Sequence, residues 1–240
     1  MQVHVFKDEE AVLTGLADYF IVSAKQAIDD NGKFSVVLSG GSSPKKLYEL
    51  LASDSYCNRV DWSKVYFFFG DERYVPLTDP HSNYLMAKKA LFDPLQINRE
   101  QVFPMDTTLD PAEAASEYTK LINAFFENNQ WRFDLILLGL GDNSHTASLF
   151  PHTTVLHETI PGVSALYIDE VQMYRITLNA PLINLAHRVA FLVYGEGKAP
   201  AVYSVMKGEH DIENHPAQLI DTNNEGLAWF LDSGAGRLLK

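Results

Sequence analysis

Four short apolar segments decide the fold: FSVVL at residues 34–38, VYFFF at 65–69, FDLILL at 133–138 and VAFLVY at 189–194. Each has the length of a strand, and each is apolar almost without interruption rather than at every second position. Continuous apolar character predicts strands that are buried on both faces, as in a parallel sheet covered by helices.

Segments with the apolar spacing of helices lie before, between and after these strands. They span residues 9–29, 44–51, 83–92, 111–128 and 198–206. Strands that alternate with helices predict an α/β fold, here a mostly parallel, Rossmann-like open sheet with helices on both faces. The chain contains no internal repeat and no Pro/Gly/Ser-rich linker, so we expect a single domain over residues 1–240.

The composition restricts the class of partner. Nineteen Lys and Arg residues against 31 Asp and Glu residues give a net charge of −12, which repels nucleic acid and anionic membranes. No segment approaches the roughly 20 apolar residues of a membrane span, and residues 1–10 lack the apolar core of a signal peptide. The lone Cys57 excludes an internal disulfide. We expect a cytoplasmic protein that binds a small molecule, with its oligomeric state left open.

Unusual loops follow three of the four predicted strands. SGGSSP follows the first at residues 39–44, GDER follows the second at 70–73, and GLGDNSH follows the third at 139–145. In open α/β sheets, ligands bind outside the carboxyl ends of the strands. We therefore expect these three loops to form one site at one edge of the sheet.

The first loop has the composition of an anion-binding turn. Gly40 and Gly41 allow backbone N–H groups to approach an anion, and Ser42 and Ser43 add hydroxyl donors. Pro44 suits the first turn of a helix whose N-terminus would face the ligand. A tight strand-to-helix turn capped by serine explains the same residues equally well. No Gly-Lys-Ser/Thr follows, which disfavours a nucleoside triphosphate.

The third loop carries a candidate general base. Among eight histidines, His145 follows a buried strand and a glycine turn, where a side chain can point into a cleft. Imidazole titrates near neutral pH and can take a proton from water. Ser144 stands where a dinucleotide-binding motif would have its third glycine, which disfavours nicotinamide. His145 and His152 are seven residues apart, unlike the ligands of a metal cluster, so we expect no metal.

Together these segments resemble the 6-phosphogluconolactonase family, whose wider superfamily includes glucosamine-6-phosphate deaminases. The resemblance runs through nearly the whole chain, and the order and spacing of its motifs make it specific. The matching segments are SGGSSP at 39–44, Trp62, DERYVP at 71–76, SN at 82–83, GLG at 139–141, HTASLFP at 145–151, RIT at 175–177 and GEGKA at 195–199. The resemblance implies a parallel-sheet α/β domain, no cofactor, and hydrolysis of 6-phospho-D-glucono-1,5-lactone in the oxidative pentose phosphate pathway.

The resemblance also implies roles for individual residues. His145 would activate water, and Asn83 would either contact sugar hydroxyls or cap a helix. Arg73 would face the lactone carbonyl or pair with Asp71 or Glu72. The phosphate would be held by Ser39, Gly40, Gly41, Ser42, Ser43, Arg175 and Lys198.

The chain departs from the family at Asn143 and Ser144, which replace the Asp-Gly pair that usually precedes the histidine. Asparagine cannot stabilise an imidazolium as a carboxylate would. We therefore expect Asp142 or Asp71 to orient His145, and we keep Asp71 and Asn143 as candidate catalytic residues. Ser144 in place of glycine also raises the question whether the loop keeps the backbone path of the family.

Two other functions compete with the lactonase. The deaminase branch has a glutamate five residues after the histidine, and here that position is Phe150, which cannot move protons. The deaminases also have tyrosine at the position of Arg73. The second alternative is a non-catalytic sugar-phosphate sensor, which the Asn143-Ser144 departure suggests. Retention of His145 beside a complete phosphate loop argues against it.

Overall fold

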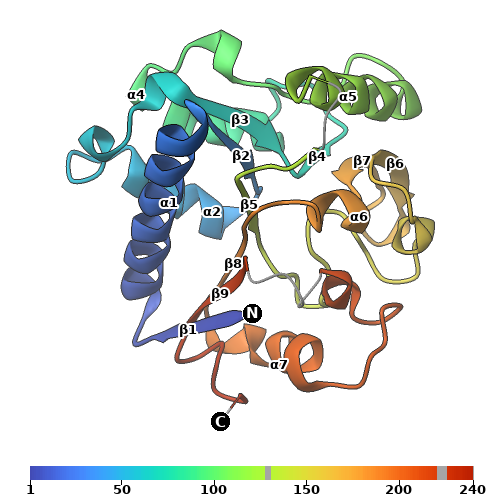
Figure 1. The fold of residues 1–240 in the computed structure, drawn as a ribbon. Coiled ribbons are helices and arrows are strands. Elements are labelled where there is room, and N and C mark those ends of the chain that lie inside the picture. Colours follow the sequence, from blue (N-terminus) through green and yellow to red (C-terminus); the bar gives the residue numbers. More distant parts are fainter. Residues whose placement is uncertain (128–130, 221–225, 240) are drawn as a thin grey trace.

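A computed structural model describes residues 1–127, 131–220 and 226–239 and shows a six-stranded parallel sheet (Figure 1). All neighbouring strands run parallel. The predicted α/β fold is confirmed, and the sheet extends beyond the four predicted strands at one edge. In spatial order the strands are β1 (Gln2–Phe6), β9 (Leu227–Asp232), β8 (Val189–Val193), β5 (Leu135–Leu138), β2 (Phe34–Leu38) and β3 (Val65–Phe69).

The helices follow the predicted segments closely, although their ends differ. The expected helix at 83–92 is divided into α3, a π-helical turn (Lys88–Phe92) and α4. Position 128, the expected end of α5, lies outside the described residues. The α-helices are α1 (Glu9–Asn31), α2 (Ser42–Leu51), α3 (Asn83–Ala87), α4 (Asp93–Leu95), α5 (Pro111–Phe125), α6 (Ala180–Ile183) and α7 (Ala199–Lys207).

Short 3₁₀ turns complete the described segments. None of the helices in these segments is long and apolar enough to cross a bilayer. The turns are η1 (Cys57–Arg59), η2 (Trp62–Lys64), η4 (Arg99–Gln101), η5 (Thr154–His157), η6 (Asp169–Val171), η7 (Glu196–Lys198) and η8 (Pro216–Leu219).

Adjacent residues of β3 show that helices cover both faces of the sheet. The ring of Phe67 packs against Trp62, which in turn contacts Phe20 of α1. The next residue, Phe68, points to the other face and packs against Phe125 of α5. Because successive strand residues face opposite sides, α1 and α5 lie on opposite faces of the sheet, as Figure 1 shows.

A small antiparallel sheet, which the sequence pattern did not indicate, follows the carboxyl end of β3. Its strands are β4 (Asp71–Arg73), β7 (Met173–Leu178) and β6 (Val163–Ile168) in that order. Asp71 pairs with Thr177, and Arg73 pairs with Arg175. This sheet carries two distant sequence motifs, DER and RIT, to the same edge of the main sheet.

Candidate active site

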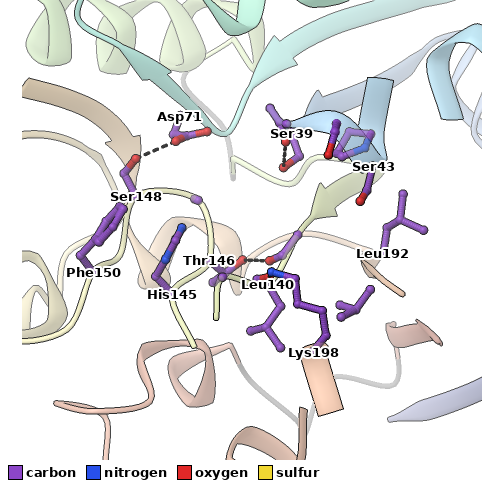
Figure 2. A pocket seen from close by; sticks show the side chains of 18 of the residues that line it. Ser39, Ser43, Asp71, Leu140, His145, Thr146, Ser148, Phe150, Leu192 and Lys198 are labelled. Atoms are coloured by element: carbon purple, nitrogen blue, oxygen red, sulfur yellow. Dashed lines mark hydrogen bonds between the residues drawn. The ribbon is translucent and has the colours of Figure 1, made fainter. Parts of the chain in front are cut away.

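The loops at the carboxyl ends of the strands surround a cavity of about 320 Å³ (Figure 2). In this view Ser43 and Lys198 lie on one side, and Asp71 and Ser148 lie on the other. Two predicted site residues, Asn83 and Asn143, are not among the lining residues. The predicted residues that do line it are Ser39, Gly40, Gly41, Ser42, Ser43, Asp71, Arg73, His145, Arg175 and Lys198.

The Ser39–Ser43 loop leaves backbone N–H groups free at the start of α2. The helix begins at Ser42, and its capping residue Gly41 has no side chain to accept from the first turn. The N–H groups of Ser42 and Ser43 accordingly have no hydrogen-bond partner within the described part of the chain. Gly41 has φ 103°, a left-handed value that favours glycine. This geometry suits an anion at the helix N-terminus.

Two buried contacts hold this loop in place. The phenol of Tyr48 accepts a hydrogen bond from the Ser39 N–H at 2.9 Å and donates one to the Ser39 carbonyl at 2.8 Å. Burial raises the pKa of Tyr48, so the phenol keeps its proton. A Cβ on Gly40 would overlap the side-chain amide of Asn83, so only glycine fits there without a shift.

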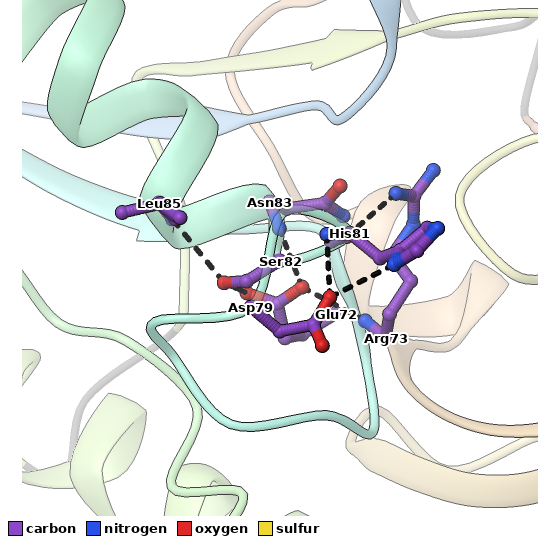
Figure 3. A network of polar contacts seen from close by, with 7 residues as sticks. All are labelled: Glu72, Arg73, Asp79, His81, Ser82, Asn83 and Leu85. Atoms are coloured by element: carbon purple, nitrogen blue, oxygen red, sulfur yellow. Dashed lines mark hydrogen bonds and ion pairs between the residues drawn. The ribbon is translucent and has the colours of Figure 1, made fainter.

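Strand β4 presents alternate residues to the cavity and to helix α3. Figure 3 shows Glu72 with Ser82 and Asn83 at the start of that helix. Asp71 and Arg73 line the cavity, whereas the Glu72 carboxylate accepts from the N–H groups of Asn83 at 2.7 Å and Tyr84 at 2.9 Å. Burial raises the pKa of Glu72 despite these bonds. Glu72 therefore anchors β4 to the N-terminus of α3.

The structure corrects the expected surroundings of Arg73 and Asn83. Arg73 donates to the carbonyl of His81 at 2.8 Å and forms no ion pair with Asp71 or Glu72 within the described residues. Ser82, rather than Asn83, caps α3. The Asn83 amide is buried and instead donates to the Asp71 carboxylate at 3.1 Å. Asn83 thus contacts a cavity residue rather than the cavity.

His145 is held by an amide on one nitrogen and by an aromatic ring on one face. Its Nδ1 lies 2.5 Å from Oδ1 of Asn143, and its ring stacks on Phe150 with centroids 4.0 Å apart. Asn143 Nδ2 donates to a carboxylate oxygen of Glu170 at 2.9 Å, which directs the amide oxygen towards the imidazole. Because an amide oxygen only accepts, Nδ1 carries the ring proton and Nε2 keeps its lone pair.

The expectation that Asp142 or Asp71 orients His145 is wrong. Asp142 pairs with Lys198 at 2.7 Å and is largely exposed. Asp71 accepts from the hydroxyl of Ser148 at 2.6 Å, and neither carboxylate hydrogen-bonds to the imidazole among the described contacts. Asn143, which replaces the family's aspartate, makes the orienting contact itself.

Burial favours a neutral imidazole at His145. Burial is the main cause that lowers the pKa of His145, and the cations Lys198 and Arg175 lower it as well. The carboxylates of Asp71 and Glu170 raise it and oppose this effect only in part. A neutral ring with a free Nε2 can accept a proton from water.

Three cationic side chains line the cavity, Arg73, Arg175 and Lys198, and they have different partners. Lys198 Nζ donates to the Leu140 carbonyl at 2.8 Å and pairs with Asp142. Arg175 is buried, and its Nε has no hydrogen-bond partner in the described part of the chain. The Nε of the half-buried Arg73 likewise has none there. Burial lowers the pKa of Arg175, whereas Asp71 raises it. Guanidinium groups that line a cavity are suited to an anionic ligand.

The histidine loop keeps a backbone conformation that normally favours glycine. Ser144 has φ 63° and Ala147 has φ 47°, both in the left-handed region. The turn closes through the Ser144 N–H, which donates to the Gly141 carbonyl at 3.0 Å. Ser144 therefore accepts the left-handed conformation, at a cost that glycine would not have.

Several residues around the cavity had no role assigned from the sequence. Ser148 holds Asp71, and Thr146 donates to the Gly139 carbonyl at 2.9 Å. Both lie inside the HTASLFP motif, so their position could have suggested them. Tyr48 and Glu170 carry no such local signal, because their contacts depend on how distant segments meet.

No group of three or more His, Cys, Asp or Glu side chains in the described ranges is placed to hold a metal ion. His152 and His157 are largely exposed. His157 contacts the carboxylate of Glu213 at 2.9 Å, and His152 lies 3.7 Å from it. Metal independence stays a prediction.

Comparison with known proteins agrees with the resemblance. A relative called 6-phosphogluconolactonase from Nostoc sp. is 38% identical over 239 residues, covering 98% of this chain and 96% of the relative. One of the same name from Synechocystis sp. is 40% identical, covering 90% and 88%. The solved 6-phosphogluconolactonase from Trypanosoma cruzi superposes with a TM-score of 0.86 at 25% identity, covering 100% and 97%. The family model "Glucosamine-6-phosphate isomerases/6-phosphogluconolactonase" matches residues 7–229, and this chain therefore belongs to that family.

Proposed function

We propose that this chain hydrolyses 6-phospho-D-glucono-1,5-lactone to 6-phosphogluconate in the oxidative pentose phosphate pathway. The names of its relatives support this choice within the family. The observation that carries it is the placement of His145, with Nδ1 occupied by Asn143, in the same cavity as the Ser39–Ser43 loop. We also propose that residues 1–240 form one lactonase domain, since its main sheet draws on strands from Gln2 to Asp232.

The phosphate is anchored by the free N–H groups of Ser42 and Ser43, with Lys198 and Arg175 as the cationic contacts. In an acidic chain, these cations and the N-terminus of α2 provide the local positive field that the ligand needs. Lys198 exchanges its contact with the exposed carboxylate of Asp142 for the phosphate. Anchoring the far end of the substrate fixes the lactone carbonyl near the imidazole.

His145 then acts as the general base. Nε2 takes a proton from water as the water oxygen bonds to C1 of the lactone, and the carbonyl oxygen becomes an oxyanion. Arg73, which lines the cavity, is the donor that we assign to this oxyanion. Collapse of the intermediate breaks the bond from C1 to the ring oxygen. The imidazolium returns its proton to that oxygen, and the base is restored.

The test is turnover of freshly prepared lactone by purified protein, measured as 6-phosphogluconate formed above the spontaneous rate. Lactone hydrolysis well above that rate, with no release of ammonia from glucosamine 6-phosphate, supports the proposal. Phosphosugar binding without turnover would indicate the sensor, and ammonia release would indicate the deaminase. Phe150 opposes the deaminase, because its ring covers His145 where that branch has a carboxylic acid.

A further inference from the structure

The Asn143 amide, which contacts the His145 ring, donates to a carboxylate from a segment that is remote in sequence. Glu170 lies in η6, the turn between β6 and β7, and accepts from Asn143 Nδ2 at 2.9 Å. We propose that Glu170 is a positioning residue of the lactonase reaction, which acts through Asn143 to select the tautomer of His145. This inference rests on the proposed function and extends it to a residue outside the cavity.

The amide of Asn143 can face the imidazole in two ways, and the contact with Glu170 favours one of them, as does the backbone N–H of His145. With Nδ2 bonded to Glu170, Oδ1 points to the ring and also accepts from the His145 backbone N–H at 3.2 Å. Nδ1 must then carry the proton. A flipped amide would present Nδ2 to Nδ1, which favours the tautomer with the proton on Nε2. That tautomer has no lone pair on Nε2 with which to accept a proton from water.

Glu170 also acts through its charge. Burial, Lys198 and Arg175 lower the pKa of His145, while Asp71 and Glu170 raise it. Of these two carboxylates, Asp71 is hydrogen-bonded to Ser148 and Asn83, so Glu170 is the one linked to the ring through a chain of hydrogen bonds. The aspartate that the family usually has at this position is here replaced by the Asn143 amide, which is hydrogen-bonded to the Glu170 carboxylate.

The first experiment reads the tautomer directly and does not depend on activity. Nitrogen chemical shifts of ¹⁵N-histidine-labelled protein distinguish a protonated Nδ1 from a protonated Nε2, and His145→Gln identifies the signal. We expect protonated Nδ1 in the parent protein and in Glu170→Gln, whose amide oxygen can still accept from Asn143. Glu170→Ala should shift His145 towards protonated Nε2. Asp169→Ala, on the same turn, should leave the tautomer unchanged.

The second experiment separates the hydrogen bond from the charge by kinetics. Glu170→Ala should lower kcat about tenfold or more while KM stays within about twofold, the loss expected for a hydrogen bond to a charged group. Glu170→Gln should retain more of kcat, and its acid limb should move to lower pH. Thermal unfolding checks that these variants, changed at an exposed side chain, remain folded.

The outcomes keep the two proposals apart. A Glu170→Ala protein with the parent tautomer, kcat and pH profile would overturn the role of Glu170 and leave the lactonase intact. A parent protein without lactone turnover would overturn the function, whatever the tautomer is. An Asp169→Ala protein that matches Glu170→Ala in tautomer and kcat would also overturn the proposal, because the effect would then belong to the turn and not to this carboxylate.

Discussion

The two loops that face each other across the cavity are built by different means. The Ser39–Ser43 loop offers backbone N–H groups, uses Gly41 where φ is positive, and is held by the buried phenol of Tyr48. The His145 loop offers a side chain, uses Ser144 and Ala147 where φ is positive, and depends on an amide whose orientation is set by a remote carboxylate.

This difference suggests that the two loops control different kinetic constants. Backbone donors at a helix N-terminus bind an anion in the ground state and in the transition state alike, so the first loop should control KM. The imidazole acts on a proton that moves during the reaction, so the second loop should control kcat. Substitutions on the two sides of the cavity should therefore have separable effects.

The largest effect is expected for His145→Ala. Losing a general base should lower kcat by roughly 10²–10⁴-fold, while KM changes little because the opposite loop still holds the phosphate. Steady-state kinetics on the lactone give both constants. His152→Ala removes a largely exposed imidazole nearby and should behave as the parent protein. Full activity of His145→Ala would refute the mechanism.

Lys198→Ala should affect KM rather than kcat. Loss of one charged contact to phosphate, worth about 1.5–3 kcal/mol, should raise KM at least tenfold with a smaller change in kcat. Lys207→Ala changes the net charge equally on an exposed position of α7 and serves as the control. An unchanged KM would remove Lys198 from the phosphate site. The same measurement on Arg175→Ala distinguishes two roles for that residue. A raised KM would place Arg175 at the phosphate, and a lowered kcat would place it at the lactone carbonyl beside Arg73.

Asn143→Asp tests how the catalytic loop tunes its base. General-base activity is lost as the pH falls through the pKa of His145, and burial places that pKa below its usual value. A carboxylate in contact with Nδ1 stabilises the imidazolium, so the pKa should rise and the acid limb of kcat should move to higher pH. The double change with Glu170→Gln keeps a donor for the new carboxylate and should show the same direction. An acid limb that does not move in either protein would mean that residue 143 does not control the ring.

The contrast between the loops also explains what the sequence could predict. The Ser39–Ser43 loop follows a strongly apolar strand, and its Gly-Gly-Ser-Ser-Pro order has local physical meaning for a turn and a helix start. The strands β2, β3, β5 and β8 were identified by the same kind of local pattern. His145 was found because it follows such a strand.

Contacts between distant segments escaped the same reasoning. The polar strand β4 has no apolar signal and exists because Asp71, Glu72 and Arg73 pair with β7. The partner of His145 could not be predicted from charge, because asparagine is uncharged. Its amide oxygen makes the contact, and the charge comes from Glu170, 27 residues further along the chain.

The smallest expected effect concerns the backbone of the catalytic loop at Ser144. Alanine and glycine both remove the hydroxyl that lies 3.2 Å from Nδ1 of His215, so their difference isolates the left-handed backbone. Glycine has no steric cost at φ 63°, and Ser144→Gly should exceed Ser144→Ala in free energy of unfolding by up to about 1 kcal/mol. The matched pair at Ser204, inside α7, should show the opposite order, because alanine is favoured within a helix by about 1 kcal/mol. Urea unfolding measures all four variants. If Ser144→Ala were the more stable of its pair, residue 144 would not hold the left-handed conformation, and the two loops would not differ in strain.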